Sequence, residues 1–395
     1  MNCISNRLDG VDYHFPFMPD IPIWENVDFQ EIEGYFNNII EDMKCCPQGQ
    51  TYHAEGDVWT HTKMVIQETM SLEIWDDLST TEKSIMFMTA LFHDMAKPLV
   101  TDRESTMKPA PKHAVIGARW IRELMWRSDL ECTFYAPWQV REYVADMIML
   151  HSLPVHFLDK RDPDYTVYAS SNVVSNLLLG NFCLADMKGR TYMYKADRAK
   201  SLDAVTMFQE YCVELECHNT TKVFPSDTCR MRYFFDRKGD PRFDYFEETK
   251  GTVVMVSGVQ GSGKSYTLKN EYSHLPVVGI DESREILGLK YGKNEGKVLQ
   301  HAKNHCKELM RDRINFAFNA TNCIKDVRRK WICLFRAYGY AVDCHYVEKP
   351  MEVTLANNKN RDKVIPESSI LHKFSKLDFP TGLEFRDVVY NIENE

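Results

Sequence analysis

The sequence predicts two domains of different fold class, an N-terminal all-α helical bundle and a C-terminal α/β domain with a parallel sheet. The chain has 395 residues, which is more than one ordinary domain holds. Residues 27–225 carry apolar side chains mainly at helical spacing, whereas from about residue 251 short apolar runs alternate with helical segments. The pattern changes near residue 231. We therefore expect domains of about 1–235 and 236–395.

The composition is that of a soluble globular protein, with 44% hydrophobic and 27% charged residues. No apolar run approaches the roughly 20 residues that span a bilayer, and no secretory signal begins the chain. The 12 cysteines are scattered without a Cys-x-x-Cys pair, which favours reduced thiols and a cytoplasmic location. The net charge of −9 argues against bulk binding of nucleic acid, although a local groove for a strand end is compatible with it.

Helical signals dominate the N-terminal half. Ser79-Thr80-Thr81-Glu82 is a capping box that opens a helix to about Leu91. His113–Trp126 and Pro137–Leu150 show the helical period, and the proline-rich segment Lys97–Pro111 predicts a loop.

The C-terminal half begins with aromatic runs at Met231–Phe235 and Arg242–Phe246, which predict a hairpin around Lys238-Gly239-Asp240-Pro241. Four strands are then expected with helical segments between them, the pattern of a parallel sheet. Their ranges are Val253–Val256, Val277–Ile280, Ile314–Phe318 and Ala341–Val347.

A phosphate-binding loop follows the first of these strands. Residues 258–265 read GVQGSGKS, which is the pattern GxxxxGK[ST] between a strand and a helix-capable segment, Tyr266–Glu271. The glycines let backbone N–H groups face one anion, Lys264 reaches the β- and γ-phosphates, and Ser265 offers a hydroxyl to Mg²⁺. We expect ATP or another nucleoside triphosphate to bind with Mg²⁺ at Gly258, Gln260, Gly261, Ser262, Gly263, Lys264, Ser265 and Tyr266.

A set of histidines and acids indicates a metal site in the N-terminal domain. His93-Asp94 follows the apolar segment Ile85–Phe92, so an imidazole and a carboxylate meet at one helix end. This ligand mix suits Mn²⁺, Fe²⁺, Co²⁺, Ni²⁺ or Zn²⁺ better than Ca²⁺, and a carboxylate such as Asp94 can bridge two metals that clamp a phosphoryl group. The other candidate ligands lie on other expected helices: His61, His113, His151 and Asp186.

The order H…HD…H…H…D, with HDMAKP at 93–98 and ADMKGR at 185–190, resembles the HD phosphohydrolase superfamily over about residues 45–200. The resemblance implies that one metal is held by His61, His93, Asp94 and Asp186, and the second by His113, His151 and the bridging Asp94. It also implies that Lys97 pairs with the substrate phosphate. His113 has the least pattern support, and each histidine taken singly is as compatible with a structural role. His53 fits either an ordinary histidine or a contact to phosphate.

Asp281 and Arg284 lie where an acceptor would meet the nucleotide. Asp281 follows the second expected strand, and a carboxylate at the carboxyl end of a parallel strand faces the substrate crevice. Arg284 is three residues further on, so one helical turn places both on the same face. The simpler alternative for Asp281 is a helix N-cap, with which a catalytic role is compatible.

These residues are similar to the polynucleotide 5′-kinase family, together with Asn319-Ala320-Thr321-Asn322 and a lid segment near 350–366 that contains Arg361. The resemblance implies that Asp281 is the general base for a 5′-hydroxyl, that Arg284 contacts the acceptor phosphate and that Arg361 covers the donor phosphates. Asn319 departs from the family, which usually has aspartate there. For Arg361 alone, a surface arginine is the plain alternative.

Together the halves resemble bacterial HD–polynucleotide kinase fusions of RNA end healing. That resemblance implies phosphorylation of 5′-hydroxyl ends and removal of 2′,3′-cyclic and terminal phosphates from RNA or DNA strand ends, with an RNA ligase as a functional partner. The rival hypothesis is a regulatory protein whose HD domain hydrolyses a small nucleotide while the loop senses ATP without transferring phosphate. A third is an HD domain retained only as structure. The basic residues between Lys293 and Lys330 are interpreted mainly as solvated helix faces.

Overall fold

In a computed structural model, the structure describes residues 7–101, 112–246, 248–290, 292–361 and 363–393. The chain forms two compact units that divide at Val223–Phe224. The proline-rich segment expected to be a loop lies largely outside the described residues; its first residues form a short helix, Lys97–Val100. No helix among the described residues has both the length and the apolar character needed to cross a membrane.

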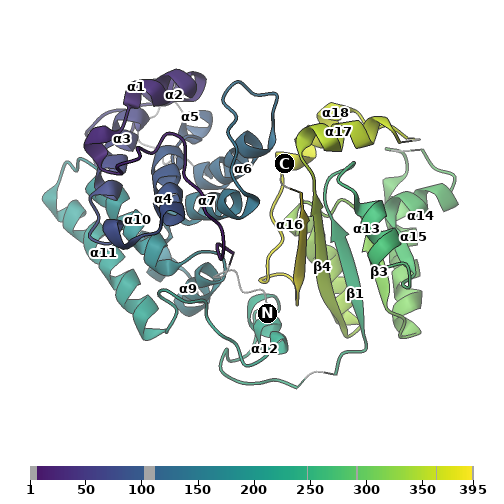
Figure 1. The fold of residues 1–395 in the computed structure, drawn as a ribbon. Coiled ribbons are helices and arrows are strands. Elements are labelled where there is room, and N and C mark those ends of the chain that lie inside the picture. The colour runs from purple at the N-terminus through teal and green to yellow at the C-terminus, as the bar shows by residue number, and fades with distance from the viewer. Residues whose placement is uncertain (1–6, 102–111, 247, 291, 362, 394–395) are drawn as a thin grey trace. The chain divides into compact units, whose positions relative to one another are not determined.

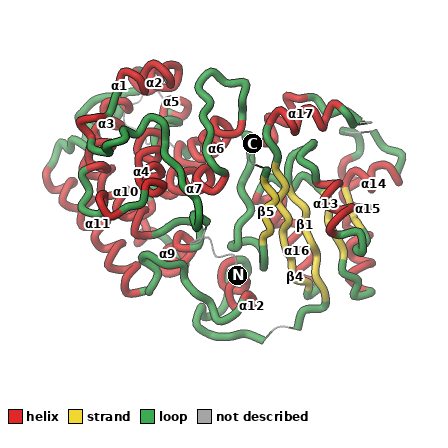
Figure 2. Tube along the Cα trace, in the orientation of Figure 1, coloured by secondary structure: helices red, strands yellow, loops and turns green. Residues whose placement is uncertain are grey.

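The N-terminal unit is built of helices, drawn in purple to teal in Figure 1 and in red in Figure 2. Its α-helices are α1 (Phe29–Tyr35), α2 (Asn37–Lys44), α3 (Val58–Met70), α4 (Thr80–Phe92), α5 (Lys97–Val100), α6 (His113–Trp126), α7 (Trp138–Leu150), α8 (Leu153–His156), α9 (Pro163–Ser171), α10 (Asn176–Lys188) and α11 (Lys195–Glu214). Short 3-10 helices lie at Trp24–Asn26, Trp75–Asp77 and Phe157–Asp159.

Helix α4 forms the centre of this unit. Its start is the predicted capping box: Ser79 accepts from the Glu82 backbone N–H, and the Glu82 side chain accepts from the Ser79 N–H. Residues 84–92 are all buried, which is the pattern of a helix covered on every side. Helices α3, α7 and α10 pack against it. The carboxyl end of α4, with His93 and Asp94, is therefore enclosed by other helices.

The C-terminal unit is an α/β domain with a parallel sheet in the order β2-β3-β1-β4-β5. Figure 2 shows the strands in yellow. The strands are β1 (Gly251–Ser257), β2 (Val277–Gly279), β3 (Phe316–Asn319), β4 (Tyr340–Glu348) and β5 (Val388–Ile392). The helices are α12 (Asp227–Phe234), α13 (Lys264–Glu271), α14 (Ile280–Ile286), α15 (Glu295–Arg311), α16 (Lys325–Ala337), α17 (Met351–Lys359) and α18 (Glu367–Phe374).

The sheet is covered on both faces, as a parallel sheet requires. On one face Leu268 of α13 packs with Val256, Ala317 and Val347 from three adjacent strands. On the other face Phe318 of β3 contacts Trp331 of α16, with ring centroids 4.3 Å apart. Because the strands are parallel, their carboxyl ends meet at one edge. The phosphate loop leaves β1 at that edge.

The region before the sheet differs from the prediction in two respects. Residues 227–234, expected in part as a hairpin strand, form helix α12, because Ser226 caps the segment by accepting from the Cys229 N–H. The unit boundary lies near 223, about a turn of chain before α12, whereas the sequence placed it at 235. The physical reason is that Arg230 of α12 donates to the Phe385 carbonyl, which anchors the helix to the sheet domain.

The four strands and the parallel sheet were predicted correctly, but a fifth strand, β5, was not predicted. The four expected strands are present, with β3 displaced to Phe316–Asn319 so that Asn319 is its last residue. Strand β5 was not predicted, because its residues VVYNI give only a short pattern near the chain end. It pairs with β4 and lengthens the edge beside the phosphate loop.

Candidate nucleotide site and candidate metal centre

The phosphate loop, residues 258–265, adopts a conformation that requires glycine. Gly258 has φ +147° and Gly261 has φ +87°, the region that L side chains rarely adopt. Space is also limiting, since a Cβ at Gly258 would lie 2.2 Å from the Val347 carbonyl oxygen, and one at Gly261 would lie 2.2 Å from the Thr354 carbonyl oxygen. The loop therefore lies directly against the end of β4 and against helix α17.

Lys264 is the first residue of α13 and lines the cavity above the loop. Its Nζ donates to the carbonyl oxygens of Gly258 and Val259, each at 2.8 Å. Burial lowers the pKa of Lys264 to about 8. A phosphate that entered the cavity would offer this ammonium group a charged acceptor in place of two neutral carbonyls.

The segment after β3 supports the phosphate loop. The Gly258 N–H donates to the Thr321 carbonyl at 2.9 Å, and the Asn322 side chain donates to the Val256 carbonyl at 2.9 Å. Arg328 of α16 stabilises this segment by donating hydrogen bonds to the Asn322 and Cys323 carbonyls. Its guanidinium also forms a two-point ion pair with Glu384, at 3.0 and 2.6 Å.

Loss of the Glu384 charge should destabilise this unit strongly. The side chains of Arg328 and Glu384 are 0% and 4% exposed, so Glu384→Gln would leave a buried cation uncompensated. We expect the free energy of unfolding to fall by about 3–5 kcal/mol in urea denaturation. The exposed Glu308→Gln on α15 should change it by less than about 0.5 kcal/mol. Equal effects of the two variants would contradict this role.

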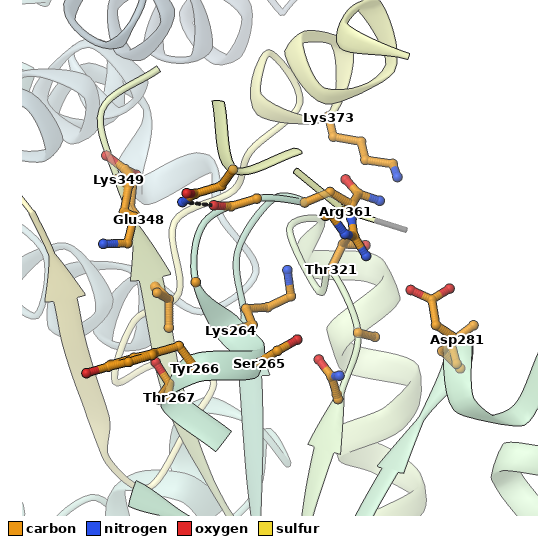
Figure 3. A pocket seen from close by; sticks show the side chains of 18 of the residues that line it. Lys264, Ser265, Tyr266, Thr267, Asp281, Thr321, Glu348, Lys349, Arg361 and Lys373 are labelled. Atoms are coloured by element: carbon orange, nitrogen blue, oxygen red, sulfur yellow. Dashed lines mark hydrogen bonds between the residues drawn. The ribbon is translucent and has the colours of Figure 1, made fainter. Parts of the chain in front are cut away.

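The phosphate loop opens onto a cavity of about 920 Å³. Figure 3 shows side chains from the loop, the β4 end and the lid around it. Most of the predicted nucleotide-binding residues line it: Gln260, Gly261, Gly263, Lys264, Ser265 and Tyr266. Gly258 and Ser262 are not among its lining residues, and the Ser262 side chain is fully buried within the loop.

Asp281 and Arg284 meet at the cavity wall, as the sequence spacing predicted. Both lie on α14, where Arg284 forms an ion pair with Asp281 and a second one with Glu295 at 2.9 Å. The N-cap of α14 is Gly279, so Asp281 is a first-turn residue and does not cap the helix. Its side chain is 68% exposed, which leaves the carboxylate accessible to an acceptor.

Asn319 ends β3 and lines the same cavity. Its side-chain amide donates to Glu282 at 3.2 Å. The position where the sequence comparison led us to expect an acid is therefore occupied by an amide that contacts a carboxylate. A second carboxylate, Glu348 at the end of β4, is 3% exposed and lines the cavity. Neither acid was singled out by sequence, because no motif marks them.

The lid contributes Arg361 from the turn after α17, and Asn357 of α17 donates to the Gly261 carbonyl at 3.0 Å. Helix α18 adds Lys373, which sequence reasoning did not identify. Among the described residues, no carboxylate lies within ion-pair distance of Lys264, Arg361 or Lys373. By contrast, Lys349 at the same cavity is paired with Glu393. Three cations that have no acid partner among the described residues thus line one cavity, which suits it to a polyanion.

The candidate metal centre lies inside the N-terminal unit, where helix ends bring the predicted ligands together. His61 lies on α3, His93 and Asp94 directly follow α4, and Asp186 lies on α10. His113 begins α6, and His151 ends α7. All of them are buried except His113, whose side chain is 19% exposed.

Asp94 faces two groups of ligands with its two carboxylate oxygens. Its Oδ2 lies 3.2 Å from His93 Nε2 and 3.7 Å from His61 Nε2. Its Oδ1 lies 3.4 Å from His113 Nε2, which in turn lies 3.4 Å from His151 Nε2. Asp186 Oδ1 lies 3.1 Å from His61 Nε2 and completes the first group. Among the described residues, two of the three groups of potential metal-binding atoms therefore share Asp94, and these two are the ligand clusters considered below.

Backbone carbonyls orient three of the imidazoles. The Nδ1 atoms of His61, His93 and His151 lie 3.3, 3.0 and 2.7 Å from carbonyl oxygens of Gly189, Ala90 and Ile148. A carbonyl only accepts, so Nδ1 of each ring is the donor, and in the neutral ring Nε2 is left as the ligand atom on the side of the cluster. This is the tautomer that binds a metal through Nε2.

The electrostatics of the cluster favour charged carboxylates and a neutral His151. Burial opposes ionisation of Asp94, but His93 and Lys97 outweigh it and hold its pKa well below the usual range. Burial is likewise outweighed at Asp186, where Arg190 and His61 lower the pKa. Burial, together with His113 and His93, lowers the pKa of His151 to about 3.

Lys97 and His53 lie at the border of the cluster. Lys97 Nζ contacts Asp94 Oδ2 at 2.6 Å and donates to the Gln48 side chain at 2.6 Å. His53 Nδ1 pairs with Glu55 at 2.8 Å, and Glu55 also lies 3.2 Å from His61 Nδ1. Gln48 and Glu55 were not predicted from sequence; they join the cluster from the segment before α3 only through folding.

Comparison with known proteins bears on the C-terminal unit. Residues 253–373 match a family model described as an AAA domain. The C-terminal unit is an α/β domain of the P-loop class. The match runs from β1 to α18, so it contains the phosphate loop, Asp281, Arg361 and Lys373.

A crystal structure of a "putative kinase" from Chloroflexus aurantiacus J-10-fl is similar at a TM-score of 0.30 and 10% identity, over 36% of this chain and 86% of that one. No curated protein sequence matches this chain.

Proposed function

We propose that the protein heals nucleic-acid ends: its C-terminal unit phosphorylates 5′-hydroxyl ends, and its N-terminal unit, an HD phosphohydrolase domain, removes 2′,3′-cyclic and terminal phosphates. The observation that best supports the kinase activity is that the proposed donor and acceptor residues line one cavity. Lys264 and Ser265 line it on the donor side, Asp281 and Arg284 on the acceptor side, and Arg361 reaches it from the lid. A nucleotide sensor requires neither an acceptor base nor a second anion site.

In the proposed transfer, each residue has a position that suits one task. The phosphate loop and Lys264 hold the donor phosphates, and Ser265 offers its hydroxyl to Mg²⁺. Asp281 accepts the proton of the attacking hydroxyl, and its ion pair with Arg284 orients the carboxylate. Arg284 presents positive charge where the phosphate next to the acceptor would lie, and Arg361 covers the donor.

The ligand atoms of the N-terminal unit fit two divalent transition metals such as Mn²⁺, Ni²⁺, Co²⁺ or Fe²⁺. Nε2 of His61, Nε2 of His93 and Oδ1 of Asp94 are buried and face other ligand atoms at 3.1 to 3.7 Å without well-aligned hydrogen bonds, and a metal would bind them in place of these contacts. His61, His93, Asp94 and Asp186 would hold one ion, and Asp94, His113 and His151 the other. When bound, such ions polarise a phosphoryl group and activate water. Lys97 is placed to exchange its contact with Asp94 for a substrate phosphate.

The two proposed activities are complementary in their chemistry. RNA cleavage without a metal leaves a 2′,3′-cyclic phosphate on one end and a 5′-hydroxyl on the other. Removal of the first and phosphorylation of the second produce the ends that an RNA ligase joins. We therefore expect strand ends of RNA or DNA as substrates, an NTP as donor and a ligase as functional partner.

The decisive experiment is incubation of a 5′-hydroxyl oligonucleotide with γ-labelled ATP and Mg²⁺. We expect label on the 5′ end with the wild-type protein and a loss of at least about 100-fold with Asp281→Ala. The matched control is Asp326→Ala on α16, an exposed acid outside the cavity, which should act as wild type. Absence of transfer by the wild-type protein would exclude the kinase and favour the regulatory alternative.

A further inference from the structure

Lys373 is a cation of the nucleotide cavity to which no motif assigns a role. It lies on α18, about two helical turns beyond the lid, and lines the cavity with the phosphate loop and Arg361. In Figure 3 it projects from its helix toward the side of the cavity where Arg361 and Asp281 lie. Lys373 is therefore placed on the same side of the cavity as the lid arginine and the proposed acceptor base.

The surroundings of Lys373 are costly for a cation in the absence of an anion. The residue is half-buried, and no acid of the described chain lies within ion-pair distance of it. Burial lowers the pKa of Lys373. Cys323 and Asp281 oppose this shift, whereas the charges of Arg361 and Arg284 add to it. A half-buried ammonium group that faces other cations is stabilised when a multiply charged anion enters.

We propose that Lys373 is a catalytic residue that contacts the γ-phosphate of the bound nucleotide and stabilises it as it passes toward the acceptor. The role of Lys373 in phosphoryl transfer depends on the proposed kinase function. Its contact with the γ-phosphate depends only on nucleotide binding in the cavity. Lys264 approaches the phosphates from the loop and Arg361 from the lid. Lys373 is the third of these cations and lies on the side of Asp281, where the negatively charged phosphoryl group would be during transfer.

The test compares nucleotides that differ only in the γ-phosphate. With Lys373→Met, binding of the β,γ-imido analogue of ATP in the presence of Mg²⁺ should weaken at least tenfold, while binding of ADP should change less than twofold. Lys373→Arg keeps the charge and should retain most of the discrimination. Lys376→Met, an exposed lysine three residues further on, is the matched control and should bind both nucleotides as wild type does.

The ADP measurement also shows that each variant is folded. Equal weakening of both nucleotides, or no change in either, would overturn the contact to the γ-phosphate. The γ-label transfer to a 5′-hydroxyl oligonucleotide is measured in parallel, where Lys373→Met should be at least tenfold slower at saturating ATP. If the wild-type protein transfers no label while Lys373→Met still discriminates against the analogue, the acceptor assignment fails and the assignment of Lys373 stands.

Discussion

Asp94→Asn should lower the metal-dependent release of phosphate from an RNA 3′ end by at least about 10³-fold, because it removes the carboxylate that both ligand clusters share. Asparagine keeps the shape of the side chain but loses the charge and one oxygen that can bind a metal. Oδ1 and Oδ2 face different histidines in the wild-type protein, so neither cluster stays complete. The measurements are phosphate release with Mn²⁺ or Ni²⁺ and the metal content of the purified protein.

The matched control for Asp94→Asn is His156→Asn, which changes an exposed histidine that pairs with Asp159 on the surface. It should leave phosphate release and metal content unchanged. The 5′-kinase activity of Asp94→Asn should also equal that of the wild type, since the nucleotide cavity lies in the other unit. Full metal content with normal phosphate release would contradict the assignment of Asp94 as the shared ligand. Loss of both activities in a folded variant would contradict two independent sites.

Lys264→Ala should lower phosphoryl transfer to a 5′-hydroxyl by about 10³-fold or more, because Lys264 is the cation of the phosphate loop itself. In the free protein its Nζ is held by two loop carbonyls, so it lies in place before nucleotide binds. Alanine leaves those carbonyls facing the donor phosphates, which adds repulsion to the loss of positive charge. Nucleotide binding and γ-label transfer measure the two contributions.

Lys269→Ala is the matched control for Lys264→Ala, since Lys269 is an exposed lysine on the same helix, α13. Its transfer rate should stay within about twofold of the wild type. Phosphate release by the N-terminal unit should be normal in both variants. Undiminished transfer by Lys264→Ala would exclude the phosphate loop as the donor site.

Local patterns predicted the elements that short-range physics controls. The capping box at Ser79 and Glu82, helix α6 at His113–Trp126 and the strand, loop and helix around Lys264 follow from residues close together in sequence. Strand β5 and helix α12 were missed or misassigned because their stability comes from distant partners. The pairing of β5 with β4 and the anchoring of Arg230 at the Phe385 carbonyl are contacts that no local period records.

The candidate sites divide in the same way. Asp281 and Arg284 were predicted to meet because one helical turn joins them, and they do. Glu348 at the end of β4 and Lys373 on α18 were not predicted, because each reaches the cavity from an element whose position depends on the whole sheet. The contact of Glu282 with Asn319 was not predicted either, because it joins two elements far apart in sequence.

By itself, the sequence determined that this protein has a helical N-terminal part and an α/β part with a phosphate loop, and it supplied the residue types of both candidate sites. Only the tertiary structure decided how those residues combine. The two oxygens of Asp94 face separate histidine groups because α4, α6 and α7 bring their ends together, and Lys373 faces Asp281 across a cavity that α18 helps to enclose. The physical reason is that the chemical character of a side chain is fixed by its residue type. Which charged side chains lie close together depends on packing between elements that are far apart in the chain.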